Sequence, residues 1–174
     1  MLKNVFLVIV AALARLLVYA ATRPNTFRVE RSERIQAAPD KIFALINDLH
    51  GFNTWNPYLK KDPATQGQYN QTAAGPGASY AWQSDKVGAG SMTILEAAPG
   101  KITMRLDFLK PFEASNTAEF TLQPVEGATQ VSWAMFGPAN FMSKLMDTLT
   151  LLNRMVGNDF AAGLANLKAI AETR

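Results

Sequence analysis

Side chains that commonly carry catalysis are sparse in this chain of 174 residues, which has no cysteine and a single histidine, His50. Without thiols and with one imidazole, the chain has no disulfide, no thiolate nucleophile and no multi-histidine metal site. His50 follows Asn47-Asp48 and precedes Gly51, a context typical of a solvated residue at a helix C-terminus. The lone histidine also argues against a triad of nucleophile, base and orienting acid.

The carboxylates form no obvious pair for acid–base chemistry. Arg105 and Asp107 alternate with apolar residues, so both are expected on the outer face of a strand, where they bridge each other. Glu113 follows Pro111-Phe112, and a bulge there would be needed to turn its side chain inward. We therefore predict no catalytic residue, and the absence of a phosphate loop or metal-ligand cluster implies no cofactor and no metal.

Aromatic and methionine side chains are the more informative set, because together they form a large and adaptable apolar interior. They either pack against one another as core or line a cavity for a ligand. Asn116 shares strand parity with Ala118 and Phe120, so it is the candidate polar group that would orient a ligand. The predicted ligand-binding residues are Trp55, Tyr80, Trp82, Met92, Met104, Phe108, Asn116, Phe120, Trp133, Met135, Leu152 and Met155.

A long C-terminal helix, predicted from about Asn140 to Glu172, must position part of this set. Pro138 and Asn140 provide the stop-and-cap signal. Apolar residues then recur every three or four positions, as on one face of a helix: Phe141, Leu145, Leu149, Leu152, Val156, Phe160, Leu164 and Leu167. Met142, Met146 and Met155 widen this stripe, so the helix is expected to lie in a concave surface.

Two glycines interrupt the predicted helix at Gly157 and Gly163. Each costs about 1 kcal/mol relative to alanine in a helix. A close approach of the helix to the sheet, or a cavity floor, would explain both.

The preceding segment predicts an antiparallel sheet. Alternating residues place a strand at 27–36, and further strand patterns follow at 67–72, 78–85, 90–97, 101–109, 113–124 and 128–136. The short glycine- and proline-rich gaps between the later strands permit only antiparallel hairpins. After the first strand, Ala38-Pro39-Asp40 opens a helix, and a second short helix or turn carries Phe52, Trp55, Pro57 and Tyr58.

Residues 5–22 form an apolar run that contains one internal charge, Arg15. Eighteen helical residues span about 27 Å, close to the ~30 Å hydrocarbon layer of a bilayer. An uncleaved single-pass anchor is favoured over a secretory signal with a Val18-Tyr19-Ala20 cleavage site, because Arg15 interrupts the apolar core. The positive-inside rule weakly favours a cytoplasmic body.

The positive charge of the chain does not indicate nucleic-acid binding. Residues 1–34 contain six basic and two acidic side chains, whereas the remaining residues contain 11 basic and 12 acidic ones. The excess therefore lies beside the apolar run and not on the body, where a phosphate-binding face would need it.

Several motifs resemble those of the START-like (SRPBCC) superfamily, and most closely its polyketide cyclase/dehydrase and lipid-transport branch. They cover residues 27–172 and include Asn47-Asp48, Trp55-Asn56-Pro57-Tyr58, Gly75-Pro76-Gly77, Val131-Ser132-Trp133 and Asp159-Phe160. The resemblance implies an α+β helix-grip fold, in which a curved antiparallel sheet of about seven strands wraps a long C-terminal helix. Residues 1–23 would be a transmembrane anchor and residues 24–174 the START-like domain.

The resemblance implies a cavity more strongly than a chemistry, since the superfamily contains lipid and hormone carriers, aromatase/cyclases, ring-hydroxylase subunits and chaperone regulators. Our leading hypothesis is a membrane-anchored module that binds a hydrophobic small molecule or lipid. The alternatives are a partner-binding regulatory domain with a filled core and a cyclase/dehydratase-type enzyme on a hydrophobic substrate; an enzyme is the less favoured reading. The ligand, the oligomeric state and the side of the membrane are not specified by the sequence.

Overall fold

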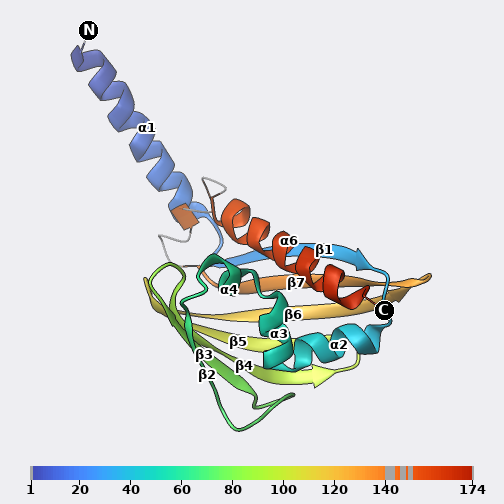
Figure 1. Ribbon diagram of the computed structural model, residues 1–174. Coiled ribbons are helices and arrows are strands. Elements are labelled where there is room, and N and C mark those ends of the chain that lie inside the picture. Colours follow the sequence, from blue (N-terminus) through green and yellow to red (C-terminus); the bar gives the residue numbers. More distant parts are fainter. Residues whose placement is uncertain (1, 140–143, 146–147, 149–150, 174) are drawn as a thin grey trace.

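The computed structural model describes residues 2–139, 144–145, 148 and 151–173, and Figure 1 shows their arrangement. Helix α1 (Leu2–Thr22) projects away from a body made of one curved sheet and four helices in the described part of the chain. The strands are β1 (Thr26–Ile35), β2 (Gln66–Tyr69), β3 (Ser79–Ser84), β4 (Gly88–Ala98), β5 (Lys101–Lys110), β6 (Ala114–Val125) and β7 (Ala128–Pro138). The body helices are α2 (Pro39–Asn47), α3 (Leu49–Trp55), α4 (Pro57–Lys61) and α6 (Leu151–Ala171).

The sheet is antiparallel throughout, with seven strands in the order β1-β7-β6-β5-β4-β3-β2. Hairpins connect β3 to β7 in sequence order, and β1 closes onto β7 at the far edge. Alternation along the longer strands gives one buried and one wet face: in β5, Ile102 and Met104 are buried whereas Arg105 is exposed. The α+β helix-grip fold with about seven strands is thereby confirmed.

Helix α6 lies across the β1 and β7 side of the sheet, with Phe160, Leu164 and Leu167 buried beneath it. Polar contacts fix its position at both ends. Arg31 donates to the backbone oxygen of Asn153 at 3.1 Å and to its side-chain oxygen at 2.8 Å. Lys168 pairs with Glu33 at 2.6 Å near the other end.

Three short helices follow β1, where the sequence predicted two. Pro57 lacks an N–H and restricts the residue before it, so the helical run stops at Trp55 and restarts after Asn56. The Asn56 side chain accepts a hydrogen bond from the Tyr58 N–H at 3.0 Å and thereby caps α4. This restart fixes the direction in which Tyr58 projects.

One local prediction needs correction. His50 lies in the first turn of α3 and stacks on Tyr69 with ring centroids 3.7 Å apart, so it is not a helix C-terminal residue. The Asp48 side chain already caps this helix by accepting from the His50 N–H at 2.9 Å. Glu113 is exposed in the turn before β6, and no bulge brings it inward.

The predicted cap at Asn140 and the first turns of the long helix lie mostly outside the described residues, as do Phe141, Met142, Met146 and Leu149. The described part confirms the apolar stripe from Val156 onward, where Val156 is half-buried and the later members are buried. Gly157 and Gly163 both allow close approaches. A Cβ on Gly157 would collide with the Arg31 guanidinium, and one on Gly163 would lie 2.6 Å from the Trp133 ring.

Candidate ligand cavity

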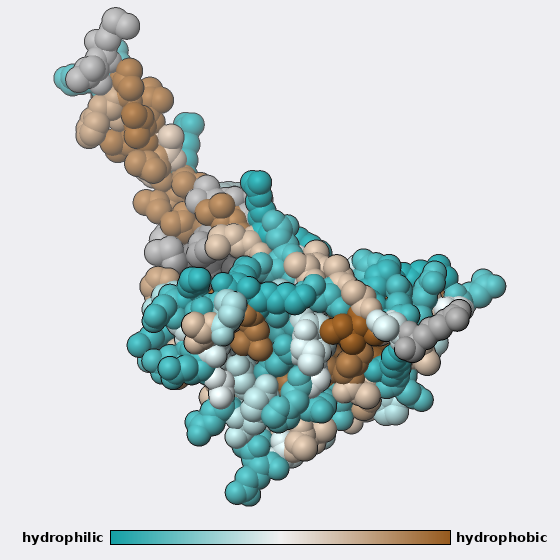
Figure 2. All heavy atoms as spheres, viewed as in Figure 1, coloured by the Kyte–Doolittle hydropathy of each residue, from teal (hydrophilic) through white to brown (hydrophobic). Residues whose placement is uncertain are grey.

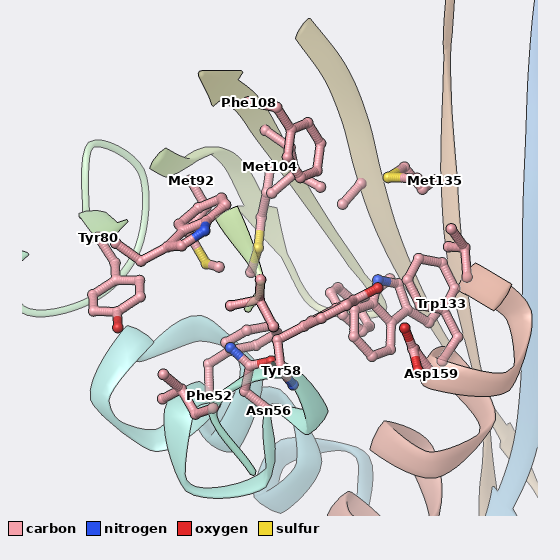
Figure 3. Close-up of a pocket in the computed structure, with 18 of the residues that line it drawn as sticks. Phe52, Asn56, Tyr58, Tyr80, Met92, Met104, Phe108, Trp133, Met135 and Asp159 are labelled. Atoms are coloured by element: carbon pink, nitrogen blue, oxygen red, sulfur yellow. Dashed lines mark hydrogen bonds between the residues drawn. The ribbon is translucent and has the colours of Figure 1, made fainter. Parts of the chain in front are cut away.

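A cavity of about 250 Å³ lies between the inner face of the sheet, helix α4 and the start of α6 (Figure 3). Its lining is mainly aromatic, aliphatic and methionine side chains. The lining residues are Phe52, Asn56, Tyr58, Leu59, Thr65, Tyr80, Trp82, Val87, Met92, Met104, Leu106, Phe108, Ala118, Phe120, Trp133, Met135, Met155, Val156, Asp159 and Phe160.

The strand register builds the sheet wall of the cavity in rows. Met104, Ala118 and Met135 are neighbours across β5, β6 and β7, and they form the central row. Ala118 is 2% exposed and has a single methyl group where its neighbours carry long side chains, so the wall is recessed at this point. The cavity therefore follows from side-chain size as well as from the curvature of the sheet.

The end of the cavity toward α6 is made of stacked aromatic rings. Trp133 on β7 stacks on Phe160 with ring centroids 4.1 Å apart and an interplanar angle of 9°. Phe120 contacts Trp133 with centroids 5.1 Å apart, and Phe52 approaches the Trp133 ring edge-on at 6.1 Å. Gly163 makes the close stacking possible, because its missing side chain leaves room for the indole.

Hydrogen bonds join two loops at the rim of the cavity, and we call this pair of residues, Asp62 and Ser84, the rim clamp. The Ser84 hydroxyl donates to the Asp62 carboxylate at 2.6 Å. The same hydroxyl oxygen accepts from the N–H of Val87, a rim residue, at 3.0 Å. The second carboxylate oxygen of Asp62 accepts from the Ala64 N–H at 3.1 Å, and Thr65 donates to the Asp62 backbone oxygen at 2.7 Å.

Polar groups in the cavity are few, and its two phenols are uncharged. Burial, followed by the negative charge of Asp159, raises the pKa of the Tyr58 hydroxyl well above its usual range. Asp159 itself forms an ion pair with Lys61 at 2.5 Å, and its side chain is 18% exposed. Burial also raises the pKa of Tyr80, with a smaller contribution from Tyr69. Both phenols therefore remain protonated at neutral pH.

Nine of the residues predicted to bind a ligand line this cavity: Tyr80, Trp82, Met92, Met104, Phe108, Phe120, Trp133, Met135 and Met155. Met155 is 59% exposed and lies at the rim. Trp55 does not line the cavity, because it is fully buried and its indole N–H donates to the Leu45 backbone oxygen at 3.0 Å. Asn116 packs its amide against Gly137 and is not a lining residue. The side chain of Leu152 lies outside the described residues.

On the helix side of the cavity, sequence reasoning found Met155 but missed Tyr58 and Asp159. Parity along β5 could have added Leu106, which lies two residues from Met104 and two from Phe108. Nothing comparable points to Tyr58, whose direction depends on the helix restart at Asn56. Among the described residues, no group of three or more His, Cys, Asp or Glu side chains could hold a metal ion.

One described helix, spanning Lys3–Thr22, is long and apolar enough to cross a membrane. Only 6% of its apolar window is buried in the structure, and Figure 2 shows its hydrophobic surface standing clear of a largely hydrophilic body. Its position near the N-terminus also fits a signal sequence.

The sheet, the helix that it grips and the cavity between them define a helix-grip protein of the START-like type. A family model described as "polyketide cyclase / dehydrase and lipid transport" matches residues 26–172, so the chain belongs to this family. No protein with curated annotation matches the chain.

Solved structures share the fold at low sequence identity. Protein CV1439 from Chromobacterium violaceum is 18% identical with a TM-score of 0.62, and the match covers 87% of this chain and all of that one. The Aha1 dimer from Colwellia psychrerythraea is 17% identical with a TM-score of 0.57, covering 84% and 96% of the two chains. The di-domain ARO/CYC BexL from the BE-7585A biosynthetic pathway is 13% identical with a TM-score of 0.63, and this chain spans 56% of it.

Proposed function

We propose that this protein is a membrane-anchored carrier that binds a single-chain or ring-shaped hydrophobic molecule in the cavity between its sheet and α4 and α6. The observation that carries the proposal is the cavity itself, with about 250 Å³ of space and an almost wholly apolar lining. A partner-binding domain with a filled core would have no use for this space. The cavity is slightly below the common range of about 300–1,000 Å³ for ligand pockets, which favours one chain or ring system over a two-chain lipid.

Membership of a family described by polyketide cyclisation and lipid transport supports a hydrophobic ligand. Helix α1 supports membrane attachment, because its apolar side chains are exposed along its length. Tethering would keep the cavity close to the bilayer, where a molecule that dissolves poorly in water is concentrated.

The test is native mass spectrometry of the full chain in lipid nanodiscs, followed by organic extraction and comparison with empty nanodiscs. We expect a stoichiometric hydrophobic molecule enriched with the wild-type protein. Ala118→Leu should lose it, because the added carbons fill the recess in the central row of the wall. Thr121→Leu on the same strand is the control, since its side chain faces the other side of the sheet.

An empty wild-type protein, or equal loading of the wild type and Ala118→Leu, would contradict the proposal. A molecule that is chemically converted when it is incubated with the protein would instead favour an enzyme of the cyclase or dehydratase type.

A further inference from the structure

One buried hydrogen-bond donor in the cavity wall has no partner among the residues that the structure describes. This donor is the indole N–H of Trp133. Trp133 lines the cavity and is only 4% exposed. Trp55, its neighbour in the aromatic cluster, shows the usual arrangement, with its N–H bonded to the Leu45 backbone oxygen at 3.0 Å. An unpaired buried donor destabilises the protein, so a ligand group that accepts a hydrogen bond from it would recover part of that cost on binding.

Tyr58 places a second donor in the same part of the cavity. Figure 3 shows Tyr58, Trp133 and Asp159 together at the α6 end, with the nitrogen edge of the indole on the side where Tyr58 lies. The Tyr58 hydroxyl forms no hydrogen bond with any described residue. Since burial and Asp159 keep this phenol protonated, it can donate to a ligand at neutral pH.

Charge in this part of the cavity disfavours an anion. Asp159 is the acidic residue of the lining, and its partner Lys61 lies 2.5 Å away with a side chain that is 47% exposed. A carboxylate ligand would lose its hydration and meet a second carboxylate whose charge Lys61 already balances. A neutral oxygen has no such cost.

We propose that the ligand is a neutral hydrophobic molecule with a carbonyl oxygen, such as a ketone or ester, that accepts hydrogen bonds from Trp133 and Tyr58. Its apolar part lies against the sheet wall, beside Met92 and Met104. This inference rests on the proposed function and specifies the ligand class of the same cavity. It accounts for two donors that no described residue satisfies in a mainly apolar lining.

Three probes of one shape test the proposal: 2-acetylnaphthalene, 2-ethylnaphthalene and 2-naphthoate, which present a ketone, a hydrocarbon and a carboxylate. Binding is measured by equilibrium dialysis of the full chain in nanodiscs against empty nanodiscs. Tyr58→Phe and Trp133→Phe each remove a donor and keep an aromatic ring. We expect either variant to weaken ketone binding about threefold to tenfold, the range of one hydrogen bond, and to change hydrocarbon binding much less.

The matched control is Tyr69→Phe, which removes a phenol hydroxyl bonded to Asn53 outside the cavity lining. It should leave all three probes unaffected. For the wild type, 2-naphthoate should bind at least about tenfold more weakly than the ketone, as expected for one carboxylate placed near another.

The outcomes separate the two proposals. If the ketone and the hydrocarbon respond equally to both variants, or if 2-naphthoate binds best, the ligand class is wrong while the carrier function stands. If the wild type binds none of the probes, the carrier function fails and the ligand class fails with it. Retained hydrocarbon binding by a variant shows that its cavity is still folded.

Discussion

At Gly163, two rigid neighbouring rings leave no room for a side chain. A Cβ at this position would lie 2.6 Å from the Trp133 ring and 3.0 Å from the Pro57 ring. Gly157 has equally little space, but its neighbour is the end of the flexible Arg31 side chain. Both glycines lie on α6, so their helix propensities are matched and only the neighbours differ.

We therefore expect Gly163→Ala to destabilise the protein by about 1–3 kcal/mol, the usual cost of forcing extra atoms into a packed core. Gly157→Ala should cost less, because the end of the Arg31 side chain can shift, with loss of its hydrogen bonds to Asn153, and alanine gains about 1 kcal/mol of helix propensity. Urea unfolding of the full chain, followed by tryptophan fluorescence, measures both changes. Equal destabilisation by the two substitutions would show that neighbour rigidity is not what distinguishes them.

Residue parity predicted the sheet wall of the cavity well, and it could not predict the helix wall. Met92, Met104 and Met135 lie on the inner face because alternation along a strand leaves only two choices of face. Tyr58 and Asp159 come from two helices that meet only in the folded chain. Strand parity also has a limit: it predicts that Asn116 faces the cavity, but its amide packs against Gly137 and does not line the cavity.

At the scale of elements, the rim clamp ties the loop after α4 to the loop between β3 and β4. Hydrogen bonds from Ser84 and from the Ala64 N–H lower the pKa of Asp62. A carboxyl whose pKa is lowered by folding stabilises the folded state above its unfolded pKa of about 3.9. That contribution disappears as the pH falls through the folded-state pKa.

We expect Asp62→Asn to lower the urea midpoint of unfolding at about pH 7, and the difference from the wild type to shrink as the pH approaches about 3. Asp85→Asn is the control, an exposed carboxylate in the neighbouring turn. Its difference from the wild type should stay near zero throughout. A gap between the wild type and Asp62→Asn that is constant with pH would mean that the side-chain shape of Asp62, and not its charge, holds the rim.

The order of elements was predictable because turn signals and alternation are local, and all seven strands were found with ends shifted by a few residues. The split of the second helix was not. The strand predicted at 67–72 corresponds to β2, which has four residues and no buried one. The split depends on the Asn56-Pro57 step. There the Asn56 side chain accepts a hydrogen bond from the Tyr58 N–H and starts a new helix, so the segment forms two helices and not one bent helix.

At the scale of the whole molecule, α1 and the body are chemically different parts joined by a short connection. Residues 23–25 are all that separate the end of α1 from the start of β1. With α1 as the proposed membrane anchor, a body held this close to the bilayer would not diffuse away from it, which suits the proposed carrier of a ligand that partitions into lipid. The strength of the attachment therefore matters to the function.

That strength is expected to be marginal, which makes the anchor sensitive to a single charge. Residues 5–22 contain ten Leu, Ile, Val or Phe side chains and one arginine, Arg15. At about −0.3 to −0.6 kcal/mol for each apolar residue and about +2.5 to +3.5 kcal/mol for a central arginine, the sum is only mildly favourable. Leu13→Arg should therefore abolish insertion.

We expect the wild-type chain to remain in the membrane pellet after extraction at alkaline pH, with a mass that includes residues 1–23. Leu13→Arg should move to the soluble fraction. Thr22→Arg should stay in the pellet, because a charge at the end of the span can reach the interface. A soluble wild-type chain whose mass shows cleavage after Ala20 would identify the segment as a signal sequence. The body would then be free in solution, and it would have to take its ligand from the bilayer without a tether.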